Sequence, residues 1–129
     1  MILLDTHVFV WAQTHSRKLS RAAHSAIRRA QRSGGIAISV ISVVEMAGLL
    51  RCGRLGLRGS FESTINELIR DVVIKPITTE IAVMTAEFPY EFPSDPADRI
   101  IAATARAENL PLVTADDRLL RCPVLKTIW

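Results

Sequence analysis

One stretch decides the fold of this chain: DPADRIIAATA, residues 95–105. It predicts a helix, because Asp95 is a favourable N-cap residue and Pro96 fits the first helical position, which needs no backbone N–H. Asp98 then falls at the third helical position, and small apolar residues follow it. A helix of this kind can pack closely against a sheet. Only its first turn is polar, and that turn holds Asp95 and Asp98.

Short apolar runs alternate with helical patterns along the rest of the chain. The runs predict strands at residues 2–4, 36–40, 72–74, 112–114 and 124–128. Helices are predicted at 8–13, within 17–32 with Ser16 or Ser20 as the start, from Ser42 onward, at 60–71 with Phe61 facing inward, and at 78–86. This alternation indicates an α/β fold: a mainly parallel sheet with helices on both faces. We expect residues 1–129 to form one domain, because this length suffices for one core.

The composition indicates a globular protein outside the membrane. The longest apolar stretch, residues 36–50, is too short to span a bilayer and contains Glu45. No basic leader precedes the first apolar run, so we expect a cytoplasmic protein rather than a secreted one. Cys52 and Cys122 have no metal-binding spacing, and we expect free thiols.

Four acidic residues follow the predicted strands. Asp5 follows 2–4, Glu45 follows 36–40, Asp98 begins the focal helix, and Asp116 follows 112–114. Because the carboxyl ends of parallel strands share one edge, these acids would repel one another without a cation. Each also has a local alternative. Asp5 suits a helix cap, and Glu45 completes a capping box with Ser42.

Carboxylate oxygens favour Mg²⁺, or Mn²⁺, over softer metals. Zinc is disfavoured because His7, His15 and His24 are scattered and lack ligand spacing. A divalent ion held by acids suits phosphodiester hydrolysis by an activated water. Thr6 and Thr114 would either bond metal-bound waters or serve only as strand-end and cap residues.

The charge distribution fits a polyanionic partner. The chain carries 16 basic and 13 acidic residues, and setting aside the four candidate acids leaves 9 acidic residues. The predicted helix at 17–32 has a strongly basic outer face. A solvated surface is the simpler interpretation of that face, and nucleic-acid contact is the alternative.

Four segments together resemble the motifs of the PIN-domain family, specifically the VapC-like toxins of bacterial toxin–antitoxin modules. They are ILLDTHVFVW at 2–11, SVISVVEM at 39–46, the focal stretch at 95–105 and LVTAD at 112–116. The resemblance implies a magnesium-dependent endoribonuclease with five strands in the order 3-2-1-4-5. It also implies inhibition by a cognate antitoxin and, often, a homodimer.

Carried over by position, the resemblance assigns metal binding and catalysis to Asp5, Glu45 and Asp98. Asp116 would be the fourth acid, with Asp117 as the adjacent alternative. Asp95 is expected to cap its helix. His7 stands where many relatives carry Asn after the Asp-Thr pair.

Two other functions fit parts of this pattern. A phospho-acceptor receiver domain also has an acidic magnesium pocket, but the predicted strand at 72–74 ends without an acceptor aspartate and the first strand ends in one carboxylate. A non-catalytic RNA-binding or partner-docking module would use all four acids as helix caps. Such a module should gain no thermal stability from Mg²⁺.

Overall fold

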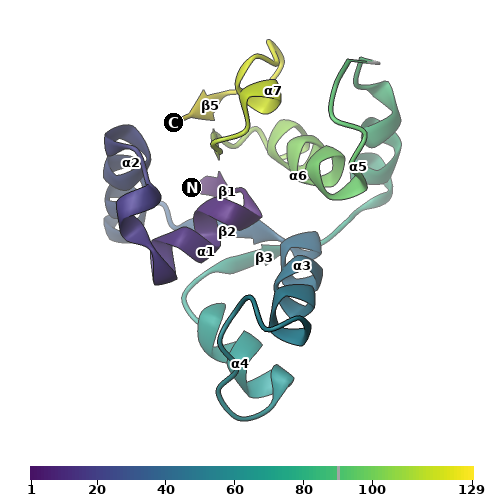
Figure 1. Ribbon diagram of the computed structural model, residues 1–129. Coiled ribbons are helices and arrows are strands. Elements are labelled where there is room, and N and C mark those ends of the chain that lie inside the picture. Colours follow the sequence, from purple (N-terminus) through teal and green to yellow (C-terminus); the bar gives the residue numbers. More distant parts are fainter. Residues whose placement is uncertain (90) are drawn as a thin grey trace.

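The computed structural model describes residues 1–89 and 91–129 and contains one five-stranded sheet (Figure 1). The strand order is β3-β2-β1-β4-β5, and every neighbouring pair is parallel. The strands are β1 (Ile2–Leu4), β2 (Ile36–Ser39), β3 (Val73–Lys75), β4 (Leu112–Val113) and β5 (Thr127–Ile128). The α/β fold and the order implied by the resemblance are therefore confirmed. This order differs from the 2-1-3-4-5 order of receiver domains, which argues against that alternative.

Seven α-helices connect the strands within the described part of the chain. They are α1 (Thr6–Thr14), α2 (Arg21–Arg32), α3 (Val40–Arg51), α4 (Phe61–Leu68), α5 (Thr79–Met84), α6 (Pro96–Ala107) and α7 (Asp117–Leu120). Two short 3₁₀ turns, η1 (Ser16–Lys18) and η2 (Thr85–Glu87), precede α2 and follow α5. No helix of residues 1–89 and 91–129 is long and apolar enough to cross a membrane.

The core has one half on each face of the sheet. Side chains alternate along a strand, so Ile2 and Leu4 join one hydrophobic cluster while Leu3 joins the other. The first cluster contains side chains of α1, α2 and α3, and the second contains side chains of α5, α6 and α7. The short side chains of Ala102 and Ala103 are completely buried, as expected for a helix packed closely in the core.

Of the two starts expected for the basic helix, Ser20 is the observed cap: its side chain accepts a hydrogen bond from the Ala23 N–H, and the helix begins at Arg21. Other predicted boundaries were wrong. The helix predicted at 60–71 ends at Leu68, and Phe61 is 50% exposed rather than inward. The last strand is shorter than predicted, since only residues 127–128 pair with β4. These errors lie at element ends, where few contacts fix the chain.

Candidate active site

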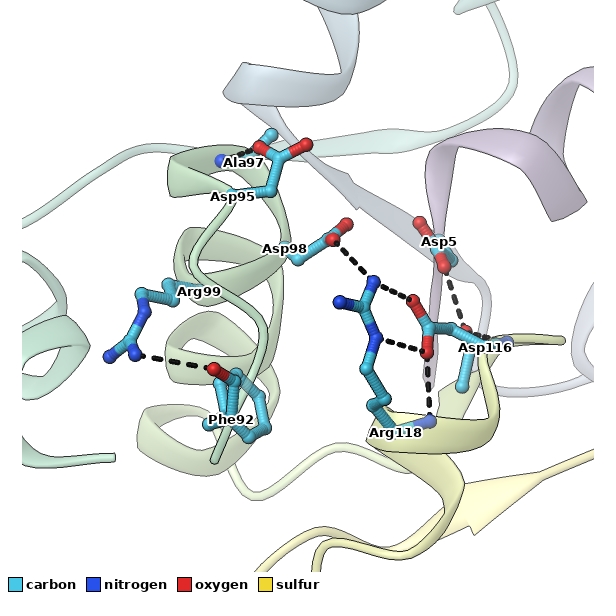
Figure 2. Close-up of polar contacts among 9 residues, drawn as sticks. Asp5, Phe92, Asp95, Ala97, Asp98, Arg99, Asp116 and Arg118 are labelled. Carbon is cyan, nitrogen blue, oxygen red and sulfur yellow. Dashed lines mark hydrogen bonds and ion pairs between the residues drawn. The ribbon is translucent and has the colours of Figure 1, made fainter. Parts of the chain in front are cut away.

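The four predicted acids lie around the carboxyl edge of the sheet. Asp5 follows β1 and Asp116 follows β4. These two strands are neighbours in the sheet, and the strand order changes direction between them. In open α/β sheets a crevice forms outside the strand ends at this point. Figure 2 shows Asp5, Asp98 and Asp116 turned toward a common space, with Asp95 at the beginning of α6.

Asp5 is held in place by Thr114. It is only 5% exposed, and its Oδ2 accepts a hydrogen bond of 2.7 Å from the buried Thr114 hydroxyl. Asp5 occupies the N-cap position of α1, but its side chain makes no capping hydrogen bond. The carboxylate is thus available to the site, and the side-chain capping alternative is not realised. Burial raises the pKa of Asp5, while the bond from Thr114 opposes that rise.

The predicted capping box at Ser42 and Glu45 was wrong. Helix α3 begins at Val40, because the side chain of Ser39 accepts a hydrogen bond from the Ile41 N–H and caps the helix earlier. Ser42 and Glu45 therefore lie inside the helix, and Glu45 does not take part in its N-cap.

Glu45 instead contacts α1. Thr6 Oγ1 lies 2.6 Å from Glu45 Oε1 and 2.7 Å from Ser42 Oγ. Because a carboxylate only accepts, the Thr6 hydroxyl donates to Glu45. Thr6 thereby holds Glu45 beside the residue that follows Asp5. The sequence had offered Thr6 only as a partner for metal-bound water or as a cap residue.

Asp98 experiences the combined charge of the other acids. Burial, followed by the negative charges of Asp5, Asp95, Asp116 and Glu45, raises its pKa from 3.8 to about 6. All four acids therefore lie close enough to act on one carboxylate. An ionised Asp98 is unfavourable here unless positive charge compensates it.

Asp116 caps α7 and also faces the other acids (Figure 2). Its Oδ1 accepts a 2.8 Å hydrogen bond from the Arg118 backbone N–H and caps α7. Burial acts to raise its pKa, but hydrogen bonds and charge from Arg118 hold that pKa below the ordinary value. The neighbouring Asp117 is exposed as the first residue of α7, so Asp116 is the residue directed toward the other acids.

Arg118 is the site residue that sequence reasoning missed. Its Nη2 lies 3.2 Å from Asp116 Oδ2 and 3.9 Å from Asp98 Oδ2, so its guanidinium lies between the two acids (Figure 2). The available signal was a basic residue two positions after Asp116, at the start of a short helix.

Asp95 caps α6 as predicted, since its Oδ1 accepts a 2.9 Å hydrogen bond from the Ala97 N–H. This bond directs one Asp95 oxygen to the backbone. Asp95 still adds negative charge near Asp98, and we assign it no place among the metal ligands.

The donor set fits a hard divalent cation in its chemistry. Four carboxylates and the hydroxyls of Thr6 and Thr114 supply only oxygen, which Mg²⁺ and Mn²⁺ prefer. In the arrangement described for residues 1–89 and 91–129, no three acidic, histidine or cysteine side chains form a compact metal cage. The Arg118 guanidinium supplies the positive charge between Asp98 and Asp116. The raised pKa of Asp98 is the observation that favours a further cation.

A groove adjoins the acids along α1. It has a volume of about 590 Å³ and extends from Thr6 and Glu45 over α1 and α3 to residues 52–56. His7, Trp11 and Lys18 lie along it. The ring centroids of His7 and Trp11 are 6.0 Å apart, and Lys18 Nζ lies 5.4 Å from the Trp11 ring. The groove is thus partly aromatic and partly basic.

Comparison with known proteins gives the following matches. The profile of the PIN domain matches residues 2–125. Ribonuclease VapC22 of Mycobacterium tuberculosis is 38% identical over 99% of this chain and 98% of its own length. Similar solved structures include VapBC2 from Rickettsia felis bound to a promoter DNA fragment (22% identity, TM-score 0.75, 98% and 97% coverage) and DNA-bound VapBC from Salmonella typhimurium (19%, 0.71, 98% and 97%). The solved structures show a shared fold, whereas the sequence matches show the family relationship.

Proposed function

This chain belongs to the PIN-domain family, and from that premise we propose that it is a metal-dependent endoribonuclease toxin inhibited by a cognate antitoxin. The observation that carries the proposal is the convergence of Asp5, Glu45, Asp98 and Asp116 at one edge of the sheet (Figure 2 shows the three aspartates), where burial and then the neighbouring acids raise the pKa of Asp98 to about 6. The name of the relative VapC22 supports RNA as the substrate, and the VapBC assemblies support an antitoxin partner.

We assign metal binding to Asp5, Glu45, Asp98 and Asp116. A bound Mg²⁺ or Mn²⁺ supplies the Lewis acidity for phosphodiester hydrolysis. The protein positions the ligands: Thr114 orients Asp5, and Thr6 orients Glu45. Asp98 must lose its proton to bind a cation, and its raised pKa makes that step pH-dependent.

The remaining parts of the proposal concern the setting of the reaction. We propose that residues 1–129 act as one ribonuclease domain in the cytoplasm, where RNA is available, and that two copies associate as a homodimer. The excess of basic over acidic residues outside the site suits RNA, which is bound through its phosphates.

The test compares two variants in which one carboxylate is replaced by the isosteric amide. Purified wild type, Asp98→Asn and Asp117→Asn are incubated with a mixed RNA pool and Mg²⁺. Asp117 is the matched control, because it is the exposed acid next to Asp116 and its side chain forms no ion pair with Arg118. We expect cutting by wild type and Asp117→Asn and none by Asp98→Asn. Equal cutting by all three would refute the assignment of Asp98.

A non-catalytic module remains the second candidate, because Asp95 and Asp116 do cap helices. The two candidates differ in their response to metal. A ligand that binds only the folded state raises the melting temperature. A Mg²⁺-dependent rise in wild type that is lost in Asp98→Asn supports the enzyme, and no rise in either protein supports the module.

A further inference from the structure

Helix α2 carries arginines along its outer side. Arg21, Arg28 and Arg32 are spaced by seven and four residues, which places them within about 20° of one line along the helix. Arg29 flanks this line. All four side chains are exposed, whereas Ala23, Ala26, Ile27 and Ala30 on the opposite side are buried. We call these four residues, Arg21, Arg28, Arg29 and Arg32, the α2 arginine face.

No acidic residue neutralises this face locally. Helix α2 contains none, and within residues 1–89 and 91–129 the ion pairs involve Arg58, Lys75 and Arg118 but no arginine of α2. Glu67 and Asp71 border a pocket of about 430 Å³ that Arg28 also borders, yet neither pairs with it. The positive charge of α2 is therefore directed to solvent.

This arrangement is unfavourable for an isolated helix. Arg28 and Arg32 are four residues apart and Arg29 and Arg32 three apart, and like charges at these spacings repel. Arg21 is the first residue of α2, where the helix dipole disfavours a cation, whereas the dipole favours Arg29 and Arg32 in the last turn. A merely solvated face is served equally well by mixed charges. One sign of charge without a partner points to an anionic ligand.

The groove beside Glu45 reaches the turn that leads into α2. Lys18 lies in η1, three residues before Arg21, and its Nζ contacts the Trp11 ring. Trp11 contacts His7, which is next to Thr6 at the start of α1. Figure 1 shows α2 beside α1, which leads back to β1 and the site. Basic and aromatic side chains thus line the groove from Lys18, in the turn that precedes α2, to Glu45.

We propose that the α2 arginine face binds the phosphates of single-stranded RNA outside the active site, with Lys18, Trp11 and His7 leading the strand to the acids. The helical rise separates Arg28 and Arg32 by about 6 Å and Arg21 and Arg32 by about 17 Å along the axis, so the face spans several phosphates. Six side chains including all four arginines line a shallow depression of about 480 Å³ there. The choice of RNA rests on the proposed function.

Binding is measured by fluorescence anisotropy with a labelled 20-nucleotide uridylate, in chelator and in an Asp98→Asn background so that no RNA is cut. The test variant is R21Q/R28Q/R32Q. The matched control, R51Q/R70Q/R106Q, removes the same charge from exposed arginines of other segments. A charge-preserving variant, R21K/R28K/R32K, shows whether α2 tolerates substitution.

Loss of three phosphate contacts lowers the slope of log Kd against log salt by about 2 and weakens binding about 10- to 100-fold at low salt. We expect this for the glutamine variant of α2, a change below about threefold for the control, and near-wild-type binding for the lysine variant. Equal weakening of test and control would overturn the proposal, as would no weakening in either or no binding by the parent protein.

Further results distinguish this proposal from the proposed nuclease activity and from the binding of an acidic protein. RNA that is bound through α2 but never cut with Mg²⁺ would refute the nuclease and leave the face in place. Normal binding and cutting by R21Q/R28Q/R32Q would refute the face and leave the nuclease. If the substitutions weaken binding of polyglutamate but not of uridylate, the face serves an acidic protein, and the RNA proposal is overturned.

Discussion

The guanidinium of Arg118 lies 3.9 Å from the carboxylate of Asp98. The same guanidinium lies 3.2 Å from Asp116, so one cation bridges acids from α6 and from the end of β4. A positive side chain at this place reduces the repulsion among the acids. It also pairs with two of the carboxylates that we assign to metal binding.

Replacing Arg118 by alanine separates these two effects. Without metal, Arg118→Ala should melt at a lower temperature than wild type, because Asp98 and Asp116 lose their counter-charge. With metal, the affinity for Mn²⁺ should rise, because no guanidinium competes for the two carboxylates. Calorimetric titration and thermal melts measure both quantities. Arg121→Ala is the control, since Arg121 follows the same helix but contacts neither acid; matching behaviour of the two variants would contradict this account.

Asp98→Asn should stabilise the metal-free protein. The raised pKa of Asp98 reflects an unfavourable charge, which asparagine removes. Solvent access and the lost helix-dipole contribution of an acid in the first turn reduce the gain to about 1 kcal/mol at neutral pH. Urea unfolding in chelator measures it. A loss of stability in Asp98→Asn would mean that its carboxylate is a structural group.

The stabilising effect of that substitution should depend on pH. Asp98 ionises near pH 6 when folded and near 3.8 ordinarily, so between these values the folded state binds more protons. Its contribution to the free energy of unfolding therefore falls as the pH rises from about 4 to about 6 and stays low above that. The gap in melting temperature between Asp98→Asn and wild type should widen over this interval. A constant gap across pH 4–7 would contradict the raised pKa.

Thr114→Val should both destabilise the protein and abolish its activity. The substitution leaves the buried Asp5 carboxylate without its 2.7 Å hydrogen bond and the Asp116 N–H without its acceptor. We expect about 1–3 kcal/mol of destabilisation and a loss of RNA cleavage. Thr104→Val is the control: it removes a buried hydroxyl that bonds only the Ile100 carbonyl, and it should retain cleavage.

The sequence predicted the sheet because its signals were local. Each central strand is a short buried run, and Asp95 with Pro96 marks the start of α6 unambiguously. The positions of Asp5, Asp98 and Asp116 follow from those boundaries, since a residue after a parallel strand lies at its carboxyl edge. The strand order came from the family resemblance rather than from the residues themselves.

The contacts between elements were beyond sequence reasoning. Two helix starts fitted the sequence equally well: a capping box at Ser42 and Glu45, and an earlier cap at Ser39. In the structure Ser39 caps α3, and Glu45 contacts Thr6 of α1 instead. Arg118 was missed because its role depends on α6, twenty residues away along the chain. Phe61 was placed inward by its hydrophobicity, although the first turn of α4 lies at the surface.

The central claim is that carboxylates at this sheet edge use a divalent ion to cut RNA. The most direct measurement is the initial cleavage rate of metal-stripped wild-type protein as Mg²⁺ is added, with Asp98→Asn in parallel. We predict no cleavage in chelator, a saturable rise with Mg²⁺ for wild type, and no rise for Asp98→Asn. Cleavage that persists in chelator, or that responds equally to Mg²⁺ in both proteins, would contradict the claim.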